Sequence, residues 1–274
     1  RSRCVHRCAC QFGRVLDRCG TEGRQGTWVE PTARARHRRH CQAAAGLSIN
    51  AAIAAATNTA DLAAFVTGVL DPRASAINYA SNLVTSQVIN ATTVQFNRGV
   101  QNNNAVIASY AAVEFTGSNW AVQRIQHQYA AAGAVETENL GSNVGPQNAF
   151  VHVQKRNTAA LNGVDEYGHR VWISAANQLS FQLRAGATTP ASQFSVAWVI
   201  YNPYMQVIKG SGTLTSTVVS PFTGNIAVTP ALPDITNASL FWNNDCSGAG
   251  TTFPQPILAV RLTAVNNIEY WRSN

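Results

Sequence analysis

Charged residues are scarce in this chain: they make up 12% of its 274 residues, whereas hydrophobic residues make up 46%. The only lysines are Lys155 and Lys209. Thr, Ser, Asn and Gln supply most of the remaining polarity. We therefore expect a globular chain whose surfaces are polar and uncharged, or covered by extensive subunit contacts.

Long apolar runs and common catalytic motifs are also missing. No stretch of about 18 apolar residues occurs, so no transmembrane helix is expected. The sequence contains no G-x-S-x-G, H-E-x-x-H or P-loop pattern, which leaves the enzyme classes that carry those motifs without support. We expect a structural or binding protein and not an enzyme.

Cysteine is almost confined to the N-terminal segment. Only Cys246 follows residue 41, and the others are Cys4, Cys8, Cys10, Cys19 and Cys41. A secreted disulfide scaffold would carry its cysteines in the folded body, so we expect the body to fold without disulfides, as in a cytosolic product. The spacings Cys4-x₃-Cys8 and His37-x₃-Cys41 each suit zinc. The gap between these pairs is far longer than in a zinc finger, and free thiols are the simpler interpretation.

Positive charge is concentrated in the same segment. Residues 1–41 contain ten arginines and three acids, a net charge of +7, whereas residues 42–274 contain ten basic and ten acidic residues. Residues 1–41 lack hydrophobic periodicity, so we expect a basic arm that is disordered on its own. One-sided charge of this kind indicates a polyanionic partner. The candidate nucleic-acid-binding residues are Arg14, Arg18, Arg24, Arg34, Arg36, Arg38 and Arg39.

Two other interpretations of the arm stay open. The arm can be a solvated tail with no binding function, or a cleavable targeting sequence. A targeting sequence is usually rich in serine and poor in acids, whereas residues 1–41 contain one serine and three acids. We favour nucleic-acid binding over both, because the positive charge is confined to a segment that lacks the hydrophobic pattern needed to fold on its own.

An alanine-rich segment follows the arm, and its pattern predicts a short helix. Leu62, Phe65, Val66, Val69 and Leu70 fall at i, i+3, i+4, i+7 and i+8, which is one apolar helical face. Asn58 or Thr59 is suited to cap the start of this helix, and Pro72 to end it. We expect a helical inner segment over residues 42–72.

Beyond Pro72 the hydrophobic period changes to two, which predicts strands. Leu179, Phe181 and Leu183 alternate with polar residues, and the same pattern recurs in other stretches separated by Gly, Pro and Asn clusters. The expected strands lie at 84–96, 105–115, 148–155, 169–174, 179–185, 194–200, 212–219, 225–229 and 258–264. With no helical pattern between them, the fold class is all-β: an eight-stranded antiparallel jelly-roll sandwich over residues 73–274, preceded by the arm and the helical segment.

This layout resembles the single-jelly-roll capsid proteins of small non-enveloped icosahedral viruses, particularly the nodavirus-like and tombusvirus-like groups. The stretch "DLAAFVTGVLDP" (61–72) is similar to the helix followed by "LDP" that leads into the first strand in many such coats. The stretch "ILAVRLTAVNNIEYW" (257–271) is similar to their last strand, and "FSVAWVIYNP" (194–203) to a central strand. The resemblance covers the whole chain as a layout, with short motifs of moderate specificity.

The resemblance implies a structural protein that self-assembles into an icosahedral shell and packages a nucleic-acid genome through its arginine-rich arm. Its partners would be further copies of itself and the viral genome, with single-stranded RNA favoured over single-stranded DNA. The host receptor is left unknown. We expect the protein in the virion, assembled inside the host cell. The connection 116–147 and the loops 157–168, 186–193 and 230–256 are expected at the outer surface or at symmetry axes.

Metal and enzyme alternatives rest on a few residues. No cofactor is expected. Calcium is the alternative, because some coats of this kind bind it between subunits, and its candidates are Asp165 and Glu166, the sole adjacent acidic pair of the body. A chymotrypsin-like β-barrel protease would use His152, Asp165 and Cys246, which occur in the required order. However, Asn244 replaces the usual glycine of the nucleophile loop. A secreted lectin-like jelly roll is the third class, which the sequons at Asn90 and Asn237 would permit.

Overall fold

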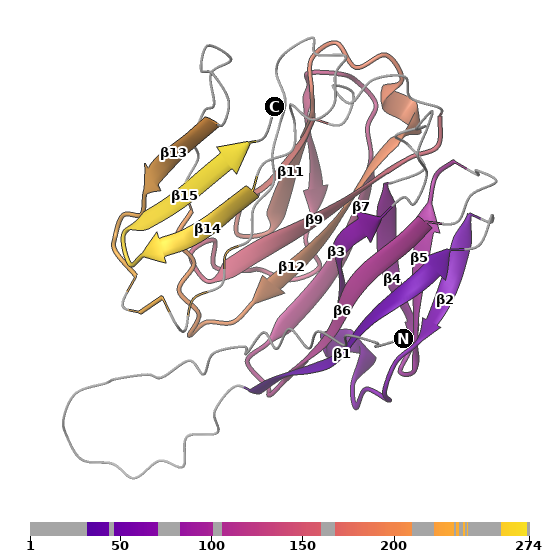
Figure 1. The fold of residues 1–274 in the computed structure, drawn as a ribbon, viewed down its shortest axis with the longest axis horizontal. Coiled ribbons are helices and arrows are strands. Elements are labelled where there is room, and N and C mark those ends of the chain that lie inside the picture. The colour runs from indigo at the N-terminus through magenta and orange to yellow at the C-terminus, as the bar shows by residue number, and fades with distance from the viewer. Residues whose placement is uncertain are drawn as a thin grey trace, which may run out of the picture.

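The computed structural model is built from antiparallel strands (Figure 1). It describes residues 47–70, 83–100, 106–159, 168–209, 222–232, 234–235, 238, 240 and 259–272, together with the backbone of residues 32–43. The regular elements in these residues are strands and two short 3-10 turns, η1 (Thr59–Asp61) and η4 (Pro190–Ser192). The expected all-β class with antiparallel sheets is confirmed.

The strands form five three-stranded sheets, and all pairs within them are antiparallel. Two sheets come from the N-terminal part of the chain: β1 (Thr32–Ala43), β6 (Val106–Thr116) and β3 (Leu62–Leu70); and β2 (Ser48–Ala52), β5 (Thr93–Arg98) and β4 (Val84–Asn90). Two come from the middle: β7 (Ala121–Gln128), β12 (Gln193–Tyr201) and β9 (Ala149–Asn157); and β10 (His169–Ala175), β11 (Gln178–Leu183) and β8 (Val135–Asn139). The last contains β13 (Phe222–Ala227), β15 (Asn267–Arg272) and β14 (Ala259–Ala264).

Strand β12 lies at the centre of the body, between β7 and β9, and both of its faces are buried. Val196, Trp198 and Ile200 belong to a first core cluster, which also contains side chains of β2, β3, β5 and β6. Ala197 and Val199 belong to a second core cluster, which is shared with β10 and β11. A continuous apolar run suits a strand buried on both faces, and the sheet β7-β12-β9 therefore separates the two clusters.

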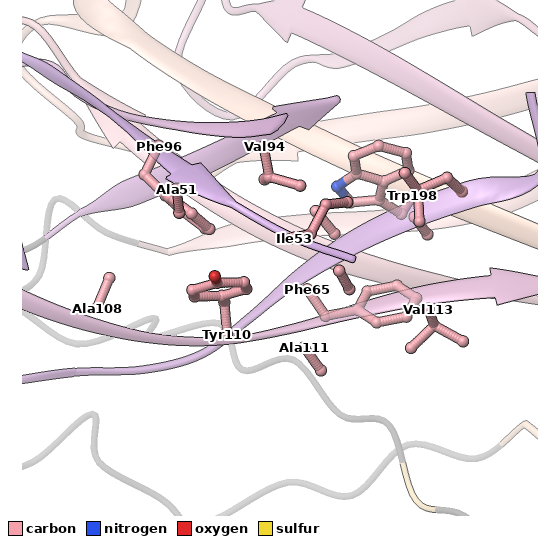
Figure 2. Close-up of a cluster of buried hydrophobic side chains, with 14 of the residues drawn as sticks. Ala51, Ile53, Phe65, Val94, Phe96, Ala108, Tyr110, Ala111, Val113 and Trp198 are labelled. Atoms are coloured by element: carbon pink, nitrogen blue, oxygen red, sulfur yellow. The ribbon is translucent and has the colours of Figure 1, made fainter. Parts of the chain in front are cut away.

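The first cluster is drawn in Figure 2, where side chains from strands far apart in the sequence point toward one another. Phe96 and Tyr110 lie with their ring centroids 4.7 Å apart, in the offset range that aromatic pairs prefer. In Figure 1 the strands β1–β6 lie on one side of the molecule and the C-terminal sheet β13-β15-β14 on the other.

Several expected strands are confirmed together with the faces predicted for them. Leu179, Phe181 and Leu183 on β11 are fully buried. Val94 and Phe96 on β5 alternate with half-buried residues. In the last hairpin Arg261 and Thr263 are exposed, whereas Leu262 and Ala264 are half-buried. The expected strand 212–219 and most of the loops 157–168 and 230–256 lie outside the described residues.

The helix expected over 62–70 is wrong, because this stretch is strand β3, paired with β6. Residues Leu62–Phe65 are all buried, so both faces of the strand carry apolar side chains there. A short continuous apolar run cannot be distinguished from a buried helical segment by its periodicity alone. A β-bulge at Thr67 then shifts the register. The β-branched residues Val66, Thr67 and Val69 and the neighbouring Gly68 also weaken a helix. Within the expected helical segment, residues 42–72, the regular elements of the described residues are the end of β1, then β2, η1 and β3.

The connection 116–147 is also more ordered than expected, since it contains β7 and β8. Strand β7 shows no clear alternation of burial, and β8 has only five residues with exposed positions at both ends. Neither strand carries the period-two apolar signal on which the expectation relied. The strands of the described residues consequently outnumber the eight that were expected.

The inner end of the expected arm contributes a strand. Residues Thr32–Ala43 form β1, which pairs along its whole length with β6. This differs from an arm that is separate from the body up to residue 41. The arginines do not prevent this pairing, because the hydrogen bonds of a ladder are made by the backbone. Charged side chains are common on edge strands. Residues 1–31 lie outside the described residues.

Candidate functional site

The arginine-rich stretch is held along one edge of the sheet β1-β6-β3. Arg34, Arg36, Arg38 and Arg39 all lie in β1, and the backbone between the first and the last extends over about 17 Å at a rise of about 3.4 Å per residue. Arg36 is the extra residue of a β-bulge, because the pairing with β6 shifts between its two neighbours. The other candidates, Arg14, Arg18 and Arg24, lie outside the described residues. The structure thus places four of the seven candidates on one strand.

A buried carboxylate lies on the partner strand opposite this stretch. Glu114 of β6 is the register partner of Arg34 on one side and of Leu62 on the other. Its Oε1 accepts the backbone N–H groups of Thr57 and Asn58 at 2.5 and 2.9 Å. A carboxylate buried in this way must be hydrogen-bonded, and here its bonds fix the turn that leads into β3.

His152, the histidine of the protease alternative, is a half-buried residue of β9. Its ring meets that of Phe65 edge-on, with centroids 5.0 Å apart. Burial lowers the pKa of His152 to about 4, and a hydrogen bond with the backbone of Val66 opposes this shift. The ring is therefore neutral at pH 7. Asp165 and Cys246 lie outside the described residues, so the structure does not bring the trio together.

Two further histidines join the sheets on either side of the second core cluster. His127 of β7 lies between two carboxylates of β8: its Nδ1 is 2.8 Å from Glu138 Oε1 and its Nε2 is 3.0 Å from Glu136 Oε2. Glu136 also accepts the backbone N–H groups of Ala130 and Ala131.

His169 of β10 makes the matching link to β12. Its Nε2 is 2.9 Å from Gln193 Oε1, and its Nδ1 is 2.8 Å from Ser195 Oγ. Burial, followed by the nearby charge of Lys155, lowers the pKa of His169 to about 3, while the hydrogen bond with Gln193 opposes the shift. The amide oxygen only accepts, so the neutral ring donates from Nε2 and accepts the Ser195 hydroxyl at Nδ1.

Tyr129 completes this network, with its hydroxyl 2.9 Å from Ser195 Oγ. Since the Ser195 hydrogen is used by His169, the Tyr129 hydroxyl donates. Ser195 and His169 are both fully buried, so their contact binds two sheets together inside the core. The sequence carries no signal for this network, because Tyr129, His169 and the pair Gln193 and Ser195 come from three separate segments and none of these residues stands out in its own segment.

The calcium candidates Asp165 and Glu166 lie outside the described residues. In the part of the chain that the structure describes, no three His, Cys, Asp or Glu side chains are grouped so as to hold a metal ion. The same residues include no helix with the length and apolar character that crossing a membrane requires.

Comparisons with models of known protein families, with curated proteins and with solved structures yield no match for this chain.

Proposed function

We propose that this protein is the structural coat protein of a small non-enveloped icosahedral virus. It self-assembles into a shell and packages a nucleic-acid genome through its arginine-rich segment. The observation that carries the proposal is the division of charge: ten arginines and three acids in residues 1–41, against a neutral remainder. A coat protein must neutralise a polyanion on one side and make uncharged contacts with its copies on the others.

Strand β1 indicates which side of the body would bind the nucleic acid under this proposal. Arginine is always charged, binds phosphate through two parallel hydrogen bonds, and stacks on unpaired bases. Because β1 anchors the inner end of the arginine-rich segment at a sheet edge, that edge would be the side of the body that faces the genome. One arm alone binds weakly, whereas many arms on one genome gain by avidity.

The jelly-roll topology, the partners and the location belong to the same proposal. Support for the topology comes from antiparallel neighbours that are not consecutive in the chain, such as β12 between β7 and β9, and β6 between β1 and β3. Such crossovers are a property of Greek-key and jelly-roll sheets. The partners are further copies of the chain and a genome of single-stranded RNA, and the assembled protein resides in the virion.

Negative-stain microscopy of the expressed chain tests assembly directly. Closed shells of uniform diameter that contain nucleic acid are the expected result. Monodisperse monomers without affinity for nucleic acid would contradict the proposal.

A salt titration tests the role of the arginines. If about seven phosphates are neutralised per chain, the logarithm of the affinity for a single-stranded oligonucleotide should fall with the logarithm of salt at a slope of about −5. Replacing Arg34, Arg36, Arg38 and Arg39 by glutamine should reduce that slope to about −2, since each contact contributes roughly −0.7. Arg261→Gln is the control, because this exposed arginine is already paired with Glu269. An equal slope in both variants would remove β1 from the interface.

A further inference from the structure

Two arginines outside the arginine-rich segment lie on one face of the central sheet. Arg124 of β7 is the register partner of Trp198, and Arg156 of β9 is the register partner of Phe194. Positions 194 and 198 have the same parity on β12, and residues directly opposite each other in a sheet share a face. The two side chains therefore rise from the same face, on the strands that flank β12 and four residues apart along it. This face also carries Trp198 of the first core cluster, and both arginine side chains are partly exposed.

Each of these arginines is held by different contacts. Arg124 Nε donates to the carbonyl oxygen of Ser86 at 2.9 Å, and an NH2 group donates to Gln126 Oε1 at 3.3 Å. The guanidinium carbon of Arg156 lies 4.7 Å from the centre of the Phe194 ring. The Nε atom of Arg156 is buried and has no hydrogen-bond partner among the described residues.

The electrostatics of this pair are unusual for structural arginines. Burial lowers the pKa of Arg124, and the positive charge of Arg156 lowers it further. Burial lowers the pKa of Arg156 as well. The ion pairs between described residues involve other cations, such as Arg261 with Glu269 at 2.6 Å. Charged side chains that leave solvent are normally paired, whereas the ion pairs found among the described residues include neither of these two arginines.

We propose that Arg124 and Arg156 form a binding site for a phosphate group. A phosphate oxyanion offers the acceptors that a guanidinium binds best, and it would neutralise two like charges that rise from one face of the sheet. The exposed Gln126 offers an amide at the rim. The site goes beyond the proposed function, since it lies on the folded body and not on the arginine-rich segment. Its phosphate can come from a nucleic-acid backbone or from a free phosphate.

Thermal unfolding of the full chain in inorganic phosphate, at constant ionic strength balanced with sodium chloride, tests the site. The wild-type Tm should rise to a plateau. In Arg156→Gln the Kd for phosphate derived from this rise should increase at least about tenfold, which corresponds to about 1.4 kcal/mol. Arg124→Gln should behave alike, but it also loses the bond to Ser86. Arg156→Gln removes no hydrogen bond within the described residues, so it keeps the test valid if Arg124→Gln does not fold.

Arg170→Gln is the matched control, because the guanidinium of Arg170 also lies over an aromatic ring, 4.8 Å from that of Trp172, but on an exposed position of β10. It should leave the phosphate Kd within about twofold, less than 0.5 kcal/mol. Arg156→Lys keeps the charge and should restore part of the binding. A phosphate response that is absent from the wild type, or equal in the wild type and both glutamine variants, would overturn the proposal.

The source of the phosphate is distinguished by a short oligothymidylate. If the ligand is a nucleic-acid backbone, the oligonucleotide should displace phosphate from the wild type and lose affinity in Arg156→Gln. If the ligand is a free phosphate, oligonucleotide binding should be equal in the two proteins while phosphate binding differs. Either result supports the site. Because the arginine-rich segment is unchanged in all these variants, failure of this site and failure of genome packaging remain separable.

Discussion

A fully buried histidine, His169, and a half-buried one, His152, should make the stability of this protein sensitive to mild acid. Burial lowers the pKa of His152 to about 4 and that of His169 to about 3. In the unfolded chain both groups have a pKa of about 6.5. Below that pH the unfolded state binds protons that the folded state does not, so stability is complete above about pH 6.5 and falls as the pH drops toward the folded values.

The expected loss follows from the size of these shifts. Each histidine costs about 1.4 kcal/mol per pH unit in this interval, which gives roughly 2 kcal/mol each and roughly 4 kcal/mol together at pH 5. This is a large part of the 5–15 kcal/mol by which domains are typically stable. Urea unfolding, followed by tryptophan fluorescence at pH 7 and at pH 5, measures the difference.

A single substitution separates the two contributions. His152→Phe preserves a ring against Phe65 and removes one titrating group, so the difference between pH 7 and pH 5 should fall by about half, to roughly 2 kcal/mol. A variant with the same pH dependence as the wild type would refute the argument, since it would show that His152 is accessible to protons in the folded state.

Three further predictions concern packing and can be checked by the same urea titrations at pH 7. Gly99→Ala should destabilise by about 3 kcal/mol or more, because its Cβ would lie 1.8 Å from a backbone oxygen at the end of β9, whereas Gly68→Ala, with open space around it, should stay within about 1 kcal/mol. Phe181→Ala should cost about 3–5 kcal/mol, since the ring is fully buried, and Val135→Ala, at a residue that is 55% exposed, should cost less than about 0.5 kcal/mol. Tyr129→Phe removes one buried hydrogen bond and should cost about 1 kcal/mol. Equal effects within either of the first two pairs, or a neutral Tyr129→Phe, would contradict the packing described here.

The strands that could be predicted from the sequence are those whose apolar residues alternate with polar ones or form a run flanked by turn residues. On β11, Leu179, Phe181 and Leu183 alternate with Ser180 and Gln182, and the structure buries the three apolar residues completely. Strand β12 could be predicted as well, because its apolar run is long and flanked by turn residues. The alternation is a local property, so it is visible before any partner strand is known.

Strands β3, β7 and β8 could not be predicted because their pattern depends on what covers them. Residues Leu62–Phe65 are apolar on both faces since β3 lies against β6 and within the first core cluster. Such a run has no period of two, and its spacing matched a helix instead. Strand β7 is stabilised by the β12 backbone beside it and carries polar residues such as Gln126 and Gln128 at exposed positions.

The sequence by itself determined the class of the body and the placement of charge, because both are sums over local residues. It also identified the four arginines of β1, although not that they form a strand. Only the tertiary structure joined His169 to Ser195 and placed Arg124 and Arg156, from the strands on either side of β12, on one face of the sheet. Contacts of this kind depend on strand order and register, and these are fixed by the packing of the whole chain.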